Sequence, residues 1–342
     1  MLKKEDRVVI LLHQGFTSHH GKTGISYLRY GESEVVAIVD RENAGKNLSQ
    51  FIDLGKNIPI VANVNQAFQY DPTVLLIGIA PSGGALPEAW YKEVEAAVEG
   101  GLSLVNGLHT PLADKFGQLK DRQWIWDIRA EPKGLKIGTA KARSLSCQRI
   151  LTVGTDMGVG KMSATIELHR SALKKGIKSK FLATGQSGIA IAASGIPLDA
   201  IRVDFAAGAV EKMVLDAAEG QQLLLIEGQG SLLHPGSTAT LPLIRGSQPT
   251  GLILVHRAGQ KHLADLPEIE IPPLTEVIKL YETLASAGGT FGKVKVKAIA
   301  LNTFHLDLNT AKKEIEKVKI ETNLPCNDLV RFDAEEILNI LF

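Results

Sequence analysis

The chain has 342 residues, with 38 Lys and Arg against 37 Asp and Glu, 44% hydrophobic residues and 22% charged residues. This composition excludes a disordered chain, and the length is enough for two domains that each have a core. The net charge is +1, and no basic stripe runs along the sequence. Neither nucleic acid nor an anionic membrane surface is therefore expected as a partner.

The chain starts with MLKKEDRVVILL, in which the apolar run from Val8 to Leu12 is too short for a signal peptide. No stretch approaches the roughly 18 apolar residues of a membrane span. The sequence thus predicts a cytoplasmic protein that does not cross a bilayer. Cys147 and Cys326 are far apart and have no Cys or His at ligand spacing. Both are predicted to be buried small side chains rather than parts of a disulfide or a zinc site.

Short apolar β-type runs alternate with amphipathic segments of helix length, which is typical of an α/β fold with parallel sheets. Strands are predicted at residues 8–12, 34–39, 58–61, 73–79 and 102–105, and then at 149–153, 178–182, 222–226, 251–255 and 294–301. The main helices are predicted at 87–98, 161–175, 206–218, 274–287 and 308–322. Residues 121–146 show no clear period. We therefore predict two domains, over 1–146 and 147–342.

The strongest motif is RILTVGTDMGVGKMSATIELHRSALKKG, in which a buried-type strand runs through a glycine-rich turn into an amphipathic helix. The N–H groups of such a turn wrap a diphosphate at the positive end of the helix dipole, and a lysine adds a point charge. The alternative is a plain glycine-rich turn with a solvated lysine. The residues predicted to bind phosphate or nucleotide are Gly154, Thr155, Asp156, Gly158, Val159, Gly160, Lys161, Met162 and Ser163.

This loop departs from the usual Gly-x4-Gly-Lys-Ser/Thr spacing. Five residues separate Gly154 from Gly160, and Met162 stands where a hydroxyl is usual. That hydroxyl coordinates magnesium, and a thioether has little affinity for a hard cation. Ser163 comes one residue later, about 100° further round the helix. The sequence therefore predicts a phosphate cradle with a weakened magnesium site.

A second glycine-rich segment, QQLLLIEGQGSLLHPG, follows another buried strand. Glu227 ends that strand, and Gly228 and Gly230 allow a close turn at the edge where phosphate is expected. Glu227 could act as a general base, hold a metal, or cap neighbouring N–H groups. His234, seven residues later, could move a proton with Glu227 or be an ordinary hydrogen-bonded histidine.

Three further segments supply polar side chains near strand ends. ATGQSG places Thr184, Gln186 and Ser187 after a strand, where they could recognise a polar substrate or simply form a turn. Arg245 and Ser247 could contact an anionic ligand. The substrate-binding set predicted from these segments is Thr184, Gln186, Ser187, Arg245 and Ser247. Asn302 ends the strand at 294–301 and is a candidate for recognising a nucleotide base.

The first domain gives weaker signals. Gly21-Lys22-Thr23 could be read as a second phosphate loop, but paired histidines precede it and the helix that follows is short. Asp40 ends a strand at the place of a ribose-binding carboxylate, yet no Gly-x-Gly-x-x-Gly precedes it, so NAD is not supported. The GIAPSGG turn at 78–84 and the strand end at 106–109 would lie on the carboxyl rim, which suggests a substrate cleft between the domains.

GTDMGVGKM resembles the phosphate loop of dethiobiotin synthetase and its relatives among the ATP-dependent amide-forming enzymes. In that family the lysine and the following threonine hold phosphates, the aspartate helps to hold magnesium, and a glutamate of a Glu-Gly-x-Gly-Gly segment approaches the metal. The resemblance implies a phosphate-binding role for Lys161 and a magnesium-binding role for Asp156 and Glu227. Met162 is where the sequence departs from the pattern.

The order GIAPSGG, WDIR, GTAKARSL, GTDMGVGKM, ATGQSG, VDFAAGAVE, EGQGSLLHPG and GSQP resembles one bacterial family over almost the whole chain. That family was long described only as of unknown function, and some members are regarded as D-glutamate N-acetyltransferases of D-amino-acid catabolism. The resemblance implies a Rossmann-like domain over 1–146 followed by a P-loop nucleotide-binding domain over 147–342. It also implies an enzyme that moves an acetyl group from acetyl-CoA to the amine of a D-amino acid such as D-glutamate. Because coenzyme A carries a diphosphate that needs no magnesium, Met162 is compatible with this activity.

Three functions follow as hypotheses. In an acetyltransferase, Glu227 or His234 would deprotonate the amine, and Lys161 would hold the cosubstrate. In an ATP-dependent ligase or kinase resembling dethiobiotin synthetase, Asp156 and Glu227 would hold magnesium. A regulator without catalysis would bind a nucleotide and not turn it over. Dimers are common among such folds, so a homo-oligomer is also a hypothesis.

Overall fold

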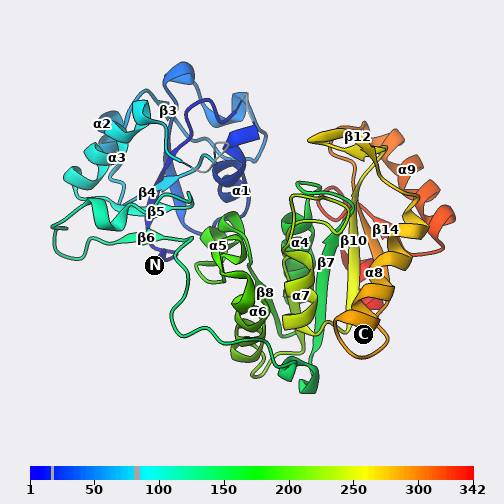
Figure 1. Ribbon diagram of the computed structural model, residues 1–342. Helices are drawn as coiled ribbons and strands as arrows, with labels where there is room; N and C mark the ends of the chain where they lie inside the picture. Colours follow the sequence, from blue (N-terminus) through cyan, green and yellow to red (C-terminus); the bar gives the residue numbers. More distant parts are fainter. Residues whose placement is uncertain (17–18, 81–84) are drawn as a thin grey trace. The chain divides into compact units, whose positions relative to one another are not determined.

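A computed structural model describes residues 1–16, 19–80 and 85–342 (Figure 1). The chain divides into two compact units, which consist of Met1–Glu131 with Gln186–Ala200, and of Pro132–Gly185 with Ile201–Phe342. The units thus separate at 131/132, whereas the sequence suggested 146. The intervening segment is tied to the second unit because Glu211 accepts hydrogen bonds from the backbone N–H groups of Thr139 and Lys141. Residues 81–84 of the GIAPSGG turn lie outside the described residues.

The first unit has a parallel sheet in the order β3-β2-β1-β4-β5-β6. Its strands are β1 Arg7–Leu11, β2 Glu34–Val39, β3 Ile60–Val61, β4 Val74–Ile77, β5 Ser103–Asn106 and β6 Ile125–Asp127. This is the strand order of a dinucleotide-binding fold. The Rossmann-like prediction is confirmed, although β6 fell in the stretch for which the sequence showed no period.

In the described part of the first unit, four α-helices accompany this sheet. They are α1 Lys22–Tyr30, α2 Val64–Ala67, α3 Glu88–Gly100 and α5 Gln186–Ala192. The fourth, α5, comes from the later half of the chain and packs against α1. The hydroxyl groups of Thr23 on α1 and Ser187 on α5 are 3.0 Å apart and share a hydrogen bond. The first unit is therefore built from two separate stretches of sequence.

The second unit has a parallel sheet in the order β14-β13-β10-β7-β9-β8. Its strands are β7 Gln148–Gly154, β8 Ser179–Leu182, β9 Leu223–Ile226, β10 Gly251–Arg257, β13 Val296–Asn302 and β14 Cys326–Asn327. The central strand β7 is buried along six of its seven residues, as expected for a parallel sheet covered on both faces. A small antiparallel hairpin joins β11 His262–Leu263 to β12 Leu266–Glu270.

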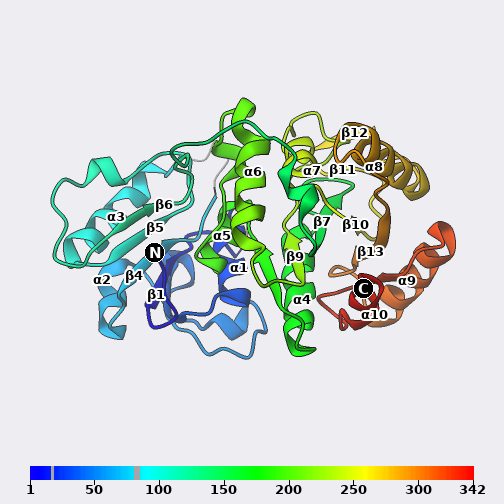
Figure 2. The ribbon, with the colours of Figure 1, turned by 90° about the horizontal axis from the view of Figure 1, so that it is seen from below.

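Helices cover both faces of this sheet. They are α4 Lys161–Lys174, α6 Val203–Ala217, α7 Thr240–Ser247, α8 Leu274–Gly288, α9 Leu308–Thr322 and α10 Glu335–Ile340. Figure 2 shows α6, α7 and α8 on one side of the strands and α4, α9 and α10 on the other. The side chains of Ala164 and Leu168 on α4 pack in one buried cluster with Ile337 and Leu338 on α10. This packing fixes α4, which starts at the phosphate loop.

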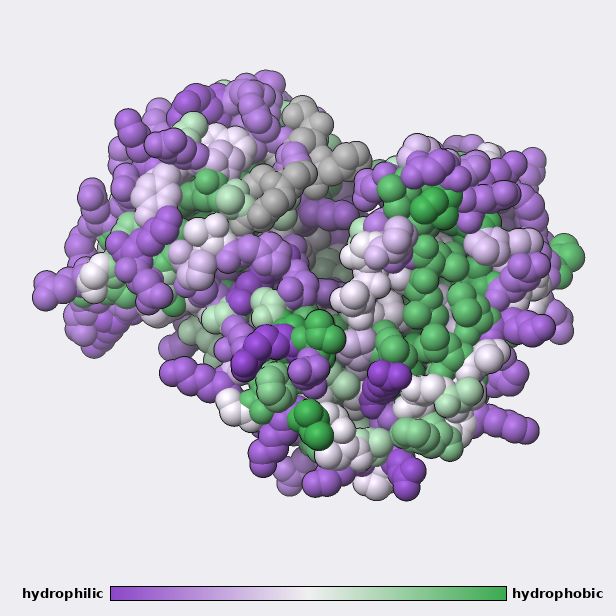
Figure 3. All heavy atoms as spheres, viewed as in Figure 1, coloured by the Kyte–Doolittle hydropathy of each residue, from purple (hydrophilic) through white to green (hydrophobic). Residues whose placement is uncertain are grey.

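Hydrophobic side chains gather on the face of the second unit that carries α7 and α8 (Figure 3), and Leu280 of α8 is 40% exposed. Such a face is suited to cover by another subunit, and the homo-oligomer stays a prediction. No helix in the described ranges is long and apolar enough to cross a membrane. Cys147 and Cys326 are both buried and free, as predicted.

Candidate functional site

The phosphate loop joins β7 to α4 at the carboxyl edge of the second sheet. Gly158 and Gly160 have φ angles of +66° and +113°, a backbone conformation that favours glycine. The backbone N–H groups of Gly158, Val159 and Gly160 form no hydrogen bond within the described part of the chain. Unpaired N–H groups of consecutive residues before a helix form a cradle for an anion. The loop therefore has the structure that the glycine spacing predicted.

Lys161 is the first residue of α4 and is buried against the loop. Its Nζ donates a hydrogen bond of 2.8 Å to the carbonyl oxygen of Asp156. The hydroxyl of Thr165 donates to the carbonyl oxygen of Lys161 and is 3.0 Å from the hydroxyl of Thr152 on β7. Nζ of Lys161 is thus held over the loop.

The carboxylate of Asp156 is occupied by N–H donors. Oδ1 accepts from the backbone of Met157 at 2.6 Å, and Oδ2 accepts from the side chain of Gln260 at 2.7 Å and from the backbone of Ala264 at 2.8 Å. Gln260 and Ala264 flank β11, so Asp156 ties this hairpin to the loop. Three such bonds leave little of a carboxylate's acceptor capacity for a metal. The arrangement does not favour the metal-binding role that the resemblance implied.

His256 supports the loop from the end of β10. Its Nδ1 is 2.9 Å from the hydroxyl of Thr155, and both side chains are buried. Burial lowers the pKa of His256 to about 4, because a charged imidazolium would lose its hydration. The ring is therefore neutral at physiological pH and orients Thr155 without adding a charge.

Tyr281 joins the two glycine-rich loops. Its hydroxyl donates to the carbonyl oxygen of Gly154 at 2.7 Å and accepts from the backbone N–H of Leu232 at 3.1 Å. Burial raises the pKa of Tyr281, so the phenol keeps its proton. The sequence analysis did not identify this residue, because a tyrosine on the apolar face of a helix cannot be distinguished by pattern from an ordinary core residue.

The second glycine-rich segment approaches β7 closely. The backbone N–H of Gly228 donates to the hydroxyl of Thr152 at 2.9 Å, and a Cβ at Gly228 would lie 1.8 Å from the carbonyl oxygen of Thr152. Glu227 Oε2 accepts from the backbone N–H groups of Thr184 and Gly185 at 2.9 and 3.3 Å. The capping role proposed for Glu227 is thus present, and it holds the β8 and β9 ends together.

His234 is buried in the same segment. Its Nδ1 accepts a hydrogen bond of 3.1 Å from the backbone N–H of Gly236, so the neutral ring carries its proton on Nε2. Within the described part of the chain Nε2 has no hydrogen-bond partner. In this tautomer Nε2 donates a hydrogen bond rather than accepting a proton.

Asn302, the last residue of β13, contacts the loop directly. Its Nδ2 donates a hydrogen bond of 2.9 Å to the carbonyl oxygen of Val159, and its Oδ1 accepts from the backbone of Phe304. The side chain of Val159 is buried in the core cluster. Met162 and Ser163 lie half-buried in the first turn of α4. The structure thus assembles the whole predicted loop and gives Asn302 a positioning contact.

Four of the predicted substrate-binding residues are not part of this cluster. Gln186 and Ser187 belong to α5 in the first unit, where Ser187 bonds Thr23. Arg245 and Ser247 lie near the carboxyl end of α7, which leads to the start of β10 and thus to the opposite edge of the sheet. Ser247 is buried and donates to the carbonyl oxygen of Leu243 within its own helix. Within the second unit, Thr184 thus lies at the sheet edge with Gly154, and Arg245 and Ser247 lie at the opposite edge.

In the first unit, Lys22 begins α1, as a second phosphate loop would require, but the hydroxyl of Thr23 is buried and bonded to Ser187. Asp40 is fully buried at the end of β2, where Oδ2 accepts from the side chain of Asn43 at 2.7 Å. Both side chains thus have structural contacts. Across residues 1–16, 19–80 and 85–342, no group of three or more His, Cys, Asp or Glu side chains could hold a metal ion.

The fold and site define a P-loop protein with an additional Rossmann-like unit. Residues 136–338 match the family model "Domain of unknown function (DUF1611_C) P-loop domain", and residues 41–131 match "Domain of unknown function (DUF1611_N) Rossmann-like domain". The chain belongs to the DUF1611 family. Over 98% of this chain and 99% of the other, it is similar to the crystal structure of a DUF1611 family protein from Anabaena variabilis, with 54% identity and a TM-score of 0.95.

Two curated relatives carry a functional name. The chain is 35% identical over 273 residues to a D-glutamate N-acetyltransferase of Tritonibacter scottomollicae, which covers 78% of this chain and 80% of that protein. It is 33% identical over 282 residues to a D-glutamate N-acetyltransferase of a Pseudoalteromonas species, which covers 81% and 83%.

Proposed function

We propose that this protein is an N-acetyltransferase that uses acetyl-CoA to acetylate the amine of a D-amino acid of the D-glutamate class. The carrying observation is the phosphate loop, which keeps its unpaired N–H groups and Lys161 but has Met162 in place of the magnesium-binding hydroxyl. Asp156, the other candidate for magnesium, is engaged with three N–H donors. A diphosphate that binds without a metal, such as that of coenzyme A, fits these residues best. The names of the two curated relatives support the same activity.

In this proposal the loop positions the cosubstrate through its diphosphate. The N–H groups of Gly158, Val159 and Gly160 donate hydrogen bonds to the phosphate oxygens, and the Lys161 ammonium offsets their charge. His256 and Tyr281 hold the loop in this shape through Thr155 and the carbonyl oxygen of Gly154. Because the cradle exists before the ligand binds, little ordering entropy is lost on binding.

The two candidate proton carriers take different roles. Glu227 is the hydrogen-bond acceptor of the pair and is proposed to take the proton from the substrate ammonium. His234 presents an Nε2–H donor, and is proposed to bind an oxygen that gains negative charge during the reaction.

The reaction forms one bond and breaks one. The free amine attacks the acetyl carbonyl carbon, the new C–N bond forms, and the C–S bond breaks to release the CoA thiolate. The ammonium loses two protons in total, of which one ends on the thiolate sulfur and the other reaches solvent through Glu227.

Calorimetric titration with acetyl-CoA, in magnesium and again in EDTA, tests the binding step. We expect equal affinity in both solutions and a loss of about tenfold or more in Lys161→Ala, because charge-assisted phosphate contacts contribute about 1.5 to 3 kcal/mol. The matched control is Lys174→Ala, which removes an exposed lysine at the other end of the same helix. Thiol release with D-glutamate, and none with L-glutamate, tests the reaction.

Two results would contradict the acetyltransferase proposal and favour another function. Tight ATP binding that requires magnesium, without acetyl-CoA binding, would favour the ligase or kinase. Acetyl-CoA or nucleotide binding without turnover of any D-amino acid would favour the regulator.

A further inference from the structure

The turn that follows β13 lies beside the phosphate loop. β13 ends at Asn302, whose Nδ2 donates a hydrogen bond of 2.9 Å to the carbonyl oxygen of Val159. Phe304 comes two residues later, so its Cα is at most about 7 Å from the Cα of Asn302. The side chain of Phe304 is 80% exposed. An aromatic ring that is open to solvent, so near a cradle for an anion, can contact a ligand that the cradle holds.

Two charged side chains from the segment after β14 hold this turn. Asp328 Oδ2 accepts from the backbone N–H and from the hydroxyl of Thr303 at 2.9 and 2.5 Å. The guanidinium group of Arg331 donates to the carbonyl oxygens of Phe304 and Leu306 at 3.3 and 2.8 Å. The backbone that carries Phe304 is thus fixed before a ligand binds, and little ordering entropy is lost when a ligand meets the ring.

Asn302 has structural contacts at both of its polar side-chain atoms. Its Oδ1 accepts a hydrogen bond of 3.1 Å from the backbone N–H of Phe304, while Nδ2 bonds Val159. The amide that the sequence analysis proposed for recognising a base is therefore engaged with the protein. A base at this edge is better held by its flat face than by its polar groups, and an exposed aromatic ring is a suitable partner for that face.

The strand order indicates which part of acetyl-CoA reaches this turn. The phosphate loop follows β7, which has β9 and then β8 on one side, and β10 and then β13 on the other. The diphosphate of acetyl-CoA carries the pantetheine arm with the acetyl thioester at one end and adenosine at the other. Glu227, the proposed proton acceptor, lies at the end of β9. With the thioester arm on that side, the adenosine arm extends toward β13, which is about 10 Å from β7.

We propose that Phe304 binds the adenine of the cosubstrate by stacking on it. This assignment rests on the proposed acetyl-CoA activity, and it gives the cosubstrate a direction along the carboxyl edge of the sheet. Because stacking requires only a flat face, the site should tolerate other bases in place of adenine. Phe304 is remote from the thioester in this arrangement, so it contributes to affinity for the cosubstrate and leaves the acetyl transfer itself unchanged.

Calorimetric titration of Phe304→Ala with acetyl-CoA tests the contact. We expect affinity to fall about fivefold to a hundredfold, as for other contacts between a base and an aromatic ring. Affinity for pyrophosphate, which can fill the cradle but has no base, should not change. Phe304→Tyr keeps the ring and should retain the affinity of the wild type. In the thiol-release assay, Phe304→Ala should raise the KM for acetyl-CoA and leave kcat unchanged.

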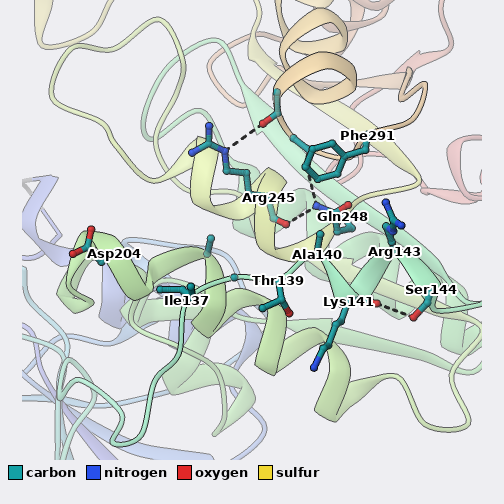
Figure 4. A pocket seen from close by; sticks show the side chains of 14 residues that line it. Ile137, Thr139, Ala140, Lys141, Arg143, Ser144, Asp204, Arg245, Gln248 and Phe291 are labelled. Atoms are coloured by element: carbon teal, nitrogen blue, oxygen red, sulfur yellow. Dashed lines mark hydrogen bonds between the residues drawn. The ribbon is translucent and has the colours of Figure 1, made fainter.

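The matched control is Phe291→Ala, which removes another exposed ring of the second unit. Phe291 is 69% exposed and lines a cavity of about 880 Å³ (Figure 4). It precedes β13, whereas Phe304 follows it, and this strand of seven residues is about 20 Å long. Affinity of Phe291→Ala for acetyl-CoA should therefore equal that of the wild type.

Tryptophan fluorescence reports on the base directly. The three tryptophans of the chain, Trp90, Trp124 and Trp126, belong to the first unit. The substitution Phe304→Trp therefore adds the only indole of the second unit. Acetyl-CoA should quench the emission that this variant has in excess of the wild type, because a stacked adenine quenches an indole. The excess emission of Phe291→Trp should not respond.

The outcomes separate this assignment from the proposed function. Acetyl-CoA binding that Phe304→Ala does not weaken would overturn the stacking contact and leave the acetyltransferase proposal standing. An equal loss of pyrophosphate affinity would also overturn it, because the variant would then act through the loop. Absence of acetyl-CoA binding in the wild type would overturn both proposals.

Discussion

Replacing Tyr281 by phenylalanine should remove the hydrogen bonds that link the two glycine-rich loops, while the aromatic ring still fills the same space in the core. The substitution removes one hydroxyl, which leaves the carbonyl oxygen of Gly154 and the N–H of Leu232 without their partner. Each unsatisfied buried polar group costs about 1 to 3 kcal/mol, so the two together should lower the unfolding free energy of the second unit by about 2 to 6 kcal/mol. Because Gly154 begins the phosphate loop, affinity for acetyl-CoA should fall as well.

The assay is urea unfolding with and without acetyl-CoA, and the matched control is Tyr70→Phe in the first unit. The hydroxyl of Tyr70 makes no hydrogen bond among the residues that the structure describes, so its loss should be nearly neutral. A midpoint for Tyr281→Phe that equals that of the control would refute the reasoning. Lower stability with unchanged affinity would show that the phenol supports the fold without shaping the loop.

Three further outcomes follow from the same contacts. His256 has a pKa of about 4 in the folded protein and about 6.5 in the unfolded chain. Because the unfolded chain binds the proton at higher pH, the unfolding free energy should fall by up to about 3 kcal/mol between pH 6.5 and pH 4. Thermal melts of His256→Asn over this range should show a smaller fall than those of the wild type. Gly228→Ala places a Cβ against the carbonyl oxygen of Thr152, so its unfolding free energy should fall by about 1 to 3 kcal/mol, and unchanged melting and binding would contradict this. Glu211→Gln weakens the charge-assisted anchoring of residues 139–141, so limited proteolysis there should be faster than in wild type, and equal rates would argue against the anchor.

The conformation of the glycine-rich loop between β7 and α4 was predicted because its requirements are local. Glycines at positions of positive φ, a lysine at the first turn of α4 and a preceding buried strand are all adjacent in the sequence. The same holds for the strand at 34–39 and the helix at 308–322, whose bounds agree with β2 and α9. Hydrophobic periodicity and helix-capping residues determine such elements, and both are visible in the amino-acid sequence.

Contacts between distant residues could not be predicted in this way. His256 contacts the loop because β10 lies next to β7, and Tyr281 contacts it because the hydroxyl reaches Gly154 from α8. Neither position carries a local signal in the sequence. Gln186 and Ser187 come two and three residues after Thr184, yet the chain passes into the first unit between Gly185 and Gln186. The pattern of hydrophobic residues does not show where the chain crosses from one unit to the other. Arg245 was predicted to contact an anionic ligand, but it lies near the end of α7, at the other edge of the sheet.

The contribution of residues 186–200 to the first unit also determines when that unit can fold during synthesis. The first unit needs residues 186–200, so a ribosome must add 69 residues beyond Glu131 (200 − 131) before the unit has all of its parts. Until then the face of α1 that packs on α5 has no cover. Domains usually fold as units as they emerge from the ribosome. The first unit of this chain cannot complete its fold in that way, because residues 186–200 are synthesised after the phosphate loop. A fragment of this chain that stops at residue 131 is therefore expected to fold poorly, because it lacks residues 186–200 of the first unit.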